Sequence, residues 1–457
     1  MKKIAIILLV FVICASLVFG IYSIKSIDSL MRPPKLSGES SMLQQAFEET
    51  VSDSDGIVMK NPLDGDYTST YLFYDLNNDN LEEAFVFYSD LSDDGLACVS
   101  IFEKINDKWS FVSKIKGKSE DIYQIDFADF NGDGICELLL SWDSTESMDS
   151  VNSPDFSTIG NRLLSIYKYS NKTTELLKTE SYSNYYVEDF NNDGSDDLFL
   201  ININLNDQEK KTAGRLLSFC DDYSVFQDQY ITLTGMLDVF NIVSDSVEEN
   251  NRTISRIFID GTISEKAVLT EVVSIDQSSF EVSLPLYEQN QSTQPTTLRD
   301  SKSSSFDFDK DGKVEIPTLE QLPHSEIILK DSETKGVINL TVWHNLDKSK
   351  LTVDAKCIYN SSFKYMFIFP DDWLNDITAV YDYNNDTLFF YEISSKGNIE
   401  ECLFSIKAFY FSNWKKDDLD YVKFVETQSY VYGYKFYDNE VKKNYVENIN
   451  SNFVCIV

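Results

Sequence analysis

The sequence predicts a mainly β protein: a β-propeller built from blades of about 55–60 residues, followed by a smaller α+β module. Three observations lead to this prediction. An acidic ten-residue pattern occurs four times, its copies are regularly spaced, and short runs of aromatic and β-branched residues flank them. Such runs, bounded by turn residues, are typical of strands.

The repeated pattern has the spacing of a calcium loop. Side-chain oxygens stand at positions 1, 3, 5 and 9, a turn residue at position 6 and an apolar residue at position 10. Alternate carboxylates can then turn inward, position 7 offers its backbone carbonyl, and position 6 makes a sharp turn. Magnesium fits less well because it demands a rigid octahedron and keeps its waters. A polar hairpin turn without metal would explain one isolated copy better than four.

The four copies begin at Asp75, Asp129, Asp189 and Asp307, and we refer to them as loops 1 to 4. Three have Gly at position 6, and loop 1 has Asn80, which also tolerates a left-handed backbone. The predicted ligands, with position 7 contributing only its carbonyl, are Asp75, Asn77, Asp79, Leu81, Glu83, Asp129, Asn131, Asp133, Ile135, Glu137, Asp189, Asn191, Asp193, Ser195, Asp197, Asp307, Asp309, Asp311, Lys313 and Glu315.

The four loops do not meet the two requirements of an EF-hand. It takes a bidentate Glu from position 12 and lies between two helices. Position 12 is Val86, Leu140, Leu200 or Thr318 here, and the flanking runs, such as residues 71–74 and 198–201, have strand character. The predicted unit is therefore strand, calcium loop, strand.

The intervals between the first acids are 54, 60 and 118 residues. The last interval spans two periods, so one repeat has lost its loop; we expect its remnant near residues 239–273, with residues 257–263 forming a plain hairpin. Repeats of this kind resemble the FG-GAP/VCBS family over about residues 40–345. The resemblance implies an integrin-α-like propeller with calcium in its blade hairpins. The Phe-Gly and Gly-Ala-Pro segments of that family are not found, which leaves the blade number open.

The amino-terminal residues predict export. Residues 1–24 carry two lysines followed by an apolar stretch long enough to cross a bilayer, which would place the rest of the chain outside the cytoplasm. We favour an uncleaved anchor; a cleaved signal peptide, or a lipid on Cys14, would leave the body on the same side. Residues 25–41 form a linker, and Leu43, Ala46 and Phe47 predict a short amphipathic helix.

The net charge of −36 excludes binding to nucleic acid through overall electrostatic attraction. Residues 42–345 are assigned to the propeller region and residues 346–457 to the α+β module, although two further degenerate blades are an alternative for the latter. Within the module, residues 377–381 and 388–391 predict a hairpin. Its turn starts like a calcium loop but has Phe390 at position 9, so we do not count it as a site.

No catalytic motif or zinc ligand set is evident, since the chain has two histidines and no Walker or Rossmann fingerprint. The sequence therefore predicts a membrane-anchored, extracytoplasmic calcium-binding propeller that binds or scaffolds an extracellular protein or glycan without catalysis. The alternative is a glycan-active hydrolase or lyase on the same scaffold, which would need acids converging outside the loops.

Overall fold

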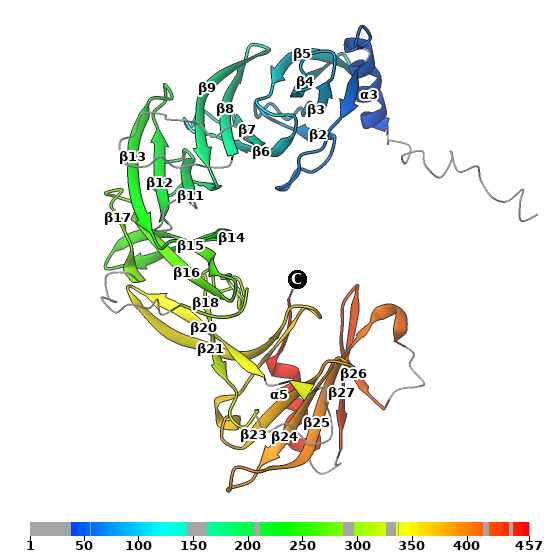
Figure 1. Cartoon of the computed structure of the whole chain (residues 1–457), viewed down its shortest axis with the longest axis vertical. Helices are drawn as coiled ribbons and strands as arrows, with labels where there is room; N and C mark the ends of the chain where they lie inside the picture. The colour runs from blue at the N-terminus through cyan, green and yellow to red at the C-terminus, as the bar shows by residue number, and fades with distance from the viewer. Residues whose placement is uncertain are drawn as a thin grey trace, which may run out of the picture. The chain divides into compact units, whose positions relative to one another are not determined.

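The computed structural model describes residues 38–54, 56–143, 162–204, 211–286, 297–325, 335–336, 338–414, 420–437 and 442–456. The chain is mainly β and forms several antiparallel sheets, which confirms the predicted class (Figure 1). The predicted anchor and most of the linker lie outside the described residues. Among the residues described, no helix is long and apolar enough to span a membrane.

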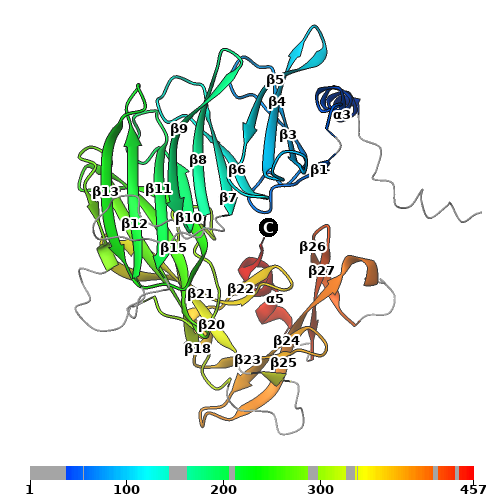
Figure 2. The same ribbon diagram turned by 45° about the horizontal axis from the view of Figure 1, so that its top comes forward.

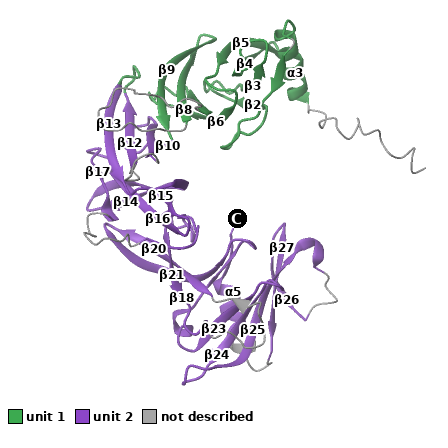
Figure 3. Cartoon of the chain, viewed as in Figure 1, with its two compact units in different colours: residues 1–157, 161–182, 220–224 green, residues 158–160, 183–219, 225–457 purple. Residues whose placement is uncertain are grey.

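The chain divides into two compact units (Figure 3). Unit 1 comprises residues 1–157, 161–182 and 220–224, and unit 2 comprises the rest. The predicted boundary after residue 345 falls within a strand of unit 2, residues 339–347.

The described residues of unit 1 form one helix and two sheets. The helix α3 (Gly38–Thr50) includes the predicted amphipathic segment and begins inside the predicted linker. The first sheet contains β1 (Ile57–Met59), β2 (Tyr71–Tyr74), β3 (Glu83–Asp90), β4 (Ala97–Ile105) and β5 (Lys108–Lys116). The second runs β6 (Ile122–Ala128), β7 (Glu137–Asp143), β8 (Arg162–Ser170) and β9 (Thr173–Tyr182).

The core of unit 1 has two parts. Leu43 and Phe47 of α3 are buried against Tyr88 and Phe102 of the first sheet, which explains the helical spacing of these apolar residues. A second apolar cluster joins the two sheets through Phe85, Trp142 and their neighbours. Burial of such large side chains supplies most of the favourable free energy of folding.

Unit 2 begins with two more four-stranded sheets whose strands pair in chain order, and Figure 2 labels all four strands of the first. One contains β10 (Asn184–Glu188), β11 (Asp197–Asn204), β12 (Lys211–Phe219) and β13 (Val225–Leu233). The next contains β14 (Asp238–Glu249), β15 (Arg252–Ser264), β16 (Ala267–Asp276) and β17 (Val282–Ser283). Consecutive antiparallel strands are the pattern of a propeller blade. The sheets alone do not establish a closed ring.

The remaining sheets of unit 2 are larger. The order β18-β20-β21-β22-β28 unites β18 (Ile316–Gln321), β20 (Asn339–Asp347), β21 (Lys350–Asn360), β22 (Tyr365–Ile368) and β28 (Phe453–Cys455). The other sheet follows the order β19-β23-β24-β25-β27-β26, and its strands are β19 (Lys335–Gly336), β23 (Ile377–Asp382), β24 (Thr387–Ile393), β25 (Ile399–Tyr410), β26 (Val422–Glu426) and β27 (Tyr430–Phe436). The described part of the unit also contains the helix α5 (Lys442–Asn452) and two single turns of 3-10 helix, Asp371–Trp373 and Phe411–Asn413.

Two local predictions have opposite outcomes. The hairpin in the carboxy-terminal region is confirmed, since Asp382 of β23 pairs with Thr387 of β24. The hairpin predicted at residues 257–263 is wrong, because β15 runs straight through it. Gly261 is required there for close packing: a Cβ atom at this position would lie 2.3 Å from the sulfur of Met236.

Candidate metal centres

The four loops share one backbone conformation. Position 6 has the positive φ that the turn requires, 66° at Asn80, 82° at Gly134, 93° at Gly194 and 88° at Gly312. Position 4 is also left-handed, which the sequence analysis did not predict; the residues are Asn78, Gly132, Asn192 and Lys310, with φ between 56° and 69°. The Asn and Gly residues at position 4 were the available signal, since both tolerate this conformation.

Backbone amides hold the side chains at positions 1, 3 and 5. In loop 4 the Asp311 amide donates to Asp307 Oδ1 at 3.1 Å and to Asp309 Oδ1 at 3.0 Å. The Gly312 amide donates to Asp307 Oδ2 at 2.9 Å, and the Lys313 amide donates to Asp311 Oδ1 at 2.8 Å. The same four hydrogen bonds occur in loops 1, 2 and 3. The loops are therefore ordered by their own side chains.

The acid at position 9 is buried in every loop. Glu83, Glu137, Asp197 and Glu315 are each at most 3% exposed. Each accepts a hydrogen bond from the amide of position 2, whose apolar side chain is itself buried: Leu76, Phe130, Phe190 or Phe308. In loops 1 to 3 this acid opens the following strand, β3, β7 or β11, whereas Glu315 pairs with Phe306 in an isolated bridge just before β18.

Burial changes the acidity of these groups. Burial is the largest of the causes that raise the pKa of Glu83, Glu137 and Asp197 to about 7 and that of Glu315 to about 8, and repulsion by the other loop carboxylates acts in the same direction. A buried carboxylate is favourable only when a partner neutralises its charge. The loops thus concentrate negative charge at a place where a cation would relieve it.

Loop 4 provides the most direct test of whether the residues fit a metal ion. One oxygen each from Asp307, Asp309 and Glu315 lie within 4.8 Å of one another, the closest grouping of three acidic side chains found among the described residues. Glu315 Oε1 is buried, and no hydrogen-bond donor reaches it in the described part of the chain. A buried carboxylate that has one oxygen without a donor and is grouped with two further carboxylates fits a hard cation.

In loops 2 and 3, a hydroxyl group donates a hydrogen bond to the second carboxylate oxygen of the position 9 acid. The hydroxyl of Tyr223, in residues 220–224 of unit 1, donates to Glu137 Oε1 at 2.8 Å, and the hydroxyl of Ser218 donates to Asp197 Oδ1. Sequence reasoning missed both residues because they lie outside the loops that they support. Such partners orient a ligand rather than bind the ion.

Lys313 distinguishes loop 4 from the others. Its Nζ lies 2.8 Å from Asp311 Oδ2, so the ammonium group already neutralises part of the charge at a predicted ligand. The side chain is about half exposed and stands at position 7, where only the backbone carbonyl is expected to bind calcium.

Comparison with known proteins identifies no family for this chain. No protein-family model and no curated protein matches the chain. One similar solved structure is a GH43 β-1,3-galactosidase, with 12% sequence identity, a TM-score of 0.26, and coverage of 80% of this chain and 75% of that one. Another is an endo-arabinase from Bacteroides thetaiotaomicron, with 10% identity, a TM-score of 0.26, and coverage of 64% of this chain and 99% of that one. A levansucrase from B. megaterium has 10% identity and a TM-score of 0.25, and the match covers 71% of this chain and 94% of that one. Likeness at this level assigns no activity to this chain.

One prediction is nevertheless corrected. The sequence analysis predicted a protein without catalysis, whereas these three neighbours are all named as enzymes. We therefore withdraw that prediction. It rested on the lack of linear motifs, and such a search does not detect catalytic groups that folding brings together from distant segments.

Proposed function

We propose that the protein is an extracytoplasmic calcium-binding β-propeller of FG-GAP/VCBS type, tethered through its amino-terminal segment, in which calcium binds loops 1 to 4. Two observations on Glu315 carry the proposal: its Oε1 is buried without a hydrogen-bond donor in the described part of the chain, and its carboxylate is grouped with those of Asp307 and Asp309. The side chains at positions 1, 3, 5 and 9 would hold the ion, together with the carbonyl of position 7. Calcium would supply the positive charge that the buried acids lack.

Calorimetric titration of the full-length chain tests this proposal. We expect uptake of four calcium ions, one for each loop, and the weak affinity of extracellular modules, with dissociation constants of about 0.1–1 mM. Asp133→Ala and Asp193→Ala should each remove one ion, because each deletes the position 5 ligand of a single loop. Asp386→Ala is the matched control, since its turn only begins like a calcium loop. Absence of calcium uptake by the folded chain would refute the proposal.

A glycan-active enzyme on the same scaffold is the second candidate. The observation that favours it is a polar, tyrosine-containing pocket of sugar size in unit 2. Release of reducing ends from neutral polysaccharides by the calcium-loaded protein would support this candidate. Lack of turnover on a broad polysaccharide panel would argue against it while leaving the calcium proposal untouched.

A further inference from the structure

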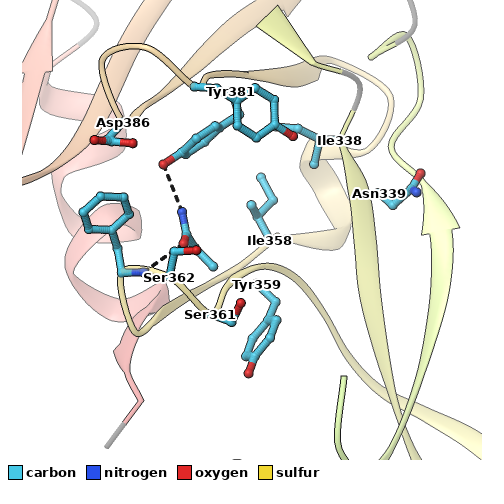
Figure 4. A pocket seen from close by; sticks show the side chains of 11 residues that line it. Ile338, Asn339, Ile358, Tyr359, Ser361, Ser362, Tyr381 and Asp386 are labelled. Atoms are coloured by element: carbon cyan, nitrogen blue, oxygen red, sulfur yellow. Dashed lines mark hydrogen bonds between the residues drawn. The ribbon is translucent and has the colours of Figure 1, made fainter. Parts of the chain in front are cut away.

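A pocket of about 320 Å³ lies in unit 2, where turns from two different sheets meet (Figure 4). The last residue of β21, Asn360, and the turn that follows it, with Ser361 and Ser362, form one side. Strand β23 and the turn that follows it contribute Tyr381, Tyr383 and Asp386. The volume is at the lower end of the range for small-molecule sites, about 300–1,000 Å³.

The frame of the pocket is fixed by one asparagine. Asn360 Oδ1 accepts a hydrogen bond from the amide of Phe363 at 3.0 Å, and its Nδ2 donates to the hydroxyl of Tyr381 at 3.1 Å. This second bond joins the end of β21 to β23, and Figure 4 draws it as a dashed line at the Tyr381 hydroxyl. Because the Tyr381 hydroxyl accepts from Asn360, its own hydrogen can be donated to a ligand. Burial raises the pKa of Tyr381 to about 12, so the hydroxyl keeps that hydrogen at neutral pH.

Several other polar groups of the pocket are free to bind. Within the described part of the chain, no side chain or amide forms a hydrogen bond with the carboxylate of Asp386 or with the side-chain hydroxyls of Ser361, Ser362 and Tyr383. The ring of Tyr383 is 65% exposed and packs edge-on against Tyr381, with centroids 5.0 Å apart. An exposed aromatic face surrounded by hydroxyl, amide and carboxylate groups is suited to a ligand with both apolar and hydroxylated surfaces.

We propose that this pocket binds a neutral saccharide residue, with the Tyr383 ring stacked on the C–H face of the sugar and Asp386, Tyr381 and the Ser361–Ser362 turn bonded to its hydroxyl groups. The proposal concerns binding alone and does not rest on the calcium loops. It assigns a ligand class to residues that lie outside every predicted site.

The lining argues against charged ligands. Among the described residues that line the pocket there is no lysine or arginine, and Asp386 would repel an anionic sugar. A quaternary ammonium group is usually held between several aromatic faces. Here Tyr381 and Tyr383, two of the three tyrosines in the lining, contact each other at an interplanar angle of 65° instead of facing each other across the pocket. The rest of the lining is mixed: besides Asp386 it has Tyr359, Phe363, two isoleucines, two asparagines and two serines.

Titration of the full-length protein with D-galactose, D-glucose and N-acetyl-D-glucosamine, followed by calorimetry, tests the proposal. D-glucuronate and tetramethylammonium serve as charged probes. We expect at least one neutral sugar to bind with a millimolar dissociation constant. Tyr383→Ala should weaken this binding by about tenfold, the equivalent of about 1.4 kcal/mol, because it removes the stacking surface. Asp386→Asn should weaken it less, since an amide retains one acceptor.

Phe226→Ala is the matched control, because Phe226 is also 65% exposed but lies in β13 and does not line the pocket. It should leave binding unchanged. Circular dichroism would verify that each variant is folded. The proposal is overturned if no neutral sugar binds, if Tyr383→Ala binds as tightly as the unmodified chain, or if only a charged probe binds. The sugar titration is repeated after calcium removal, with folding monitored by circular dichroism. Sugar binding by the folded, calcium-free chain would show that the saccharide proposal holds independently of the calcium proposal.

Discussion

The buried carboxyl group at position 9 makes each loop sensitive to pH. Its pKa in the calcium-free fold is about 7 or 8, above the ordinary value near 4 for an unfolded chain. The folded form therefore binds more protons than the unfolded form between these values, and stability falls as pH rises through that window. Calcium binds the deprotonated group, so its affinity should rise over the same window.

Glu315→Gln isolates this effect in loop 4. The amide keeps an acceptor for the Phe308 backbone but carries no charge to bury. We expect the variant to bind one calcium ion fewer and, without calcium, to be more stable than the unmodified chain at about pH 8. Thermal melts at about pH 6 and 8, with calcium and with chelator, provide the measurement. A variant less stable than the parent in chelator at the higher pH would contradict this account.

Lys313 should weaken calcium binding at loop 4. Its ammonium group competes for Asp311, so Lys313→Ala should tighten binding at this loop by a few-fold, the scale expected for an exposed ion pair. Calcium titration of a chain whose other three loops are disabled would measure this change. Lys310→Asn is the control, because it removes the same charge from the same loop at a left-handed position that Asn tolerates. Equal effects of both substitutions would show that only net charge matters.

At the scale of an element, the sheet of β14 to β17, which occupies the repeat without a calcium loop, is held by buried ion pairs. Asp245 of β14 pairs with Arg256 of β15, and both side chains are 2% exposed. Arg299 pairs with Asp260, and both are fully buried. Asp245 Oδ2 also accepts from the amide of Val314, at position 8 of loop 4. In this sheet the buried acids are therefore neutralised by arginine side chains. In the repeats with loops 1 to 4, we propose that a calcium ion has that role.

Removal of one partner should be strongly destabilising. Arg256→Ala leaves Asp245 buried without its cation, which we expect to lower the free energy of unfolding by about 3–5 kcal/mol. Denaturant unfolding would measure the loss. Arg252→Ala is the control, because Arg252 is 62% exposed and its pair with Asp276 should contribute at most about 1 kcal/mol. A similar small loss for both variants would show that the buried pair has no special role.

The loops could be predicted from sequence and the ion pairs could not, for a physical reason. Within a loop every contact joins residues at most seven positions apart, so spacing alone identifies the acids, the turns and the strands on either side. Asp260 and Arg299 are 39 residues apart and meet only when the sheet has formed. The Asp-Gly pair at 260–261 was therefore misread as a turn, whereas its acid binds Arg299 and its glycine accommodates Met236.

At the scale of the whole molecule, calcium should stabilise the sheets unequally. Loops 1 and 2 belong to unit 1, loops 3 and 4 to unit 2, and β14 to β17 carry none. A ligand at 100 times its dissociation constant stabilises a fold by about 2.7 kcal/mol per site. Chelation should therefore lower the melting temperature and speed hydrogen exchange at residues 71–90 and 122–143, while β15 and β16 keep more of their protection.

Hydrogen-exchange mass spectrometry of the full chain, with calcium and with chelator, provides this comparison. Magnesium added after chelation is the control and should not restore protection, because it does not suit these flexible loops. Uniform loss of protection across all sheets would contradict unequal stabilisation. At this scale the sequence predicted the β class and the repeated strand–loop–strand units, but not how the sheets assemble, since that depends on contacts between distant segments.

The burial of an acid at the start of β3, β7 and β11 has a consequence for biogenesis. A newly made chain in a compartment poor in calcium would have to bury these charges uncompensated, so its sheets should close slowly and reopen readily. Crossing the membrane, as we propose, would bring the chain into a medium that provides the missing ion. Maturation would then begin on the far side of the membrane, with the external calcium concentration deciding when the chain becomes rigid.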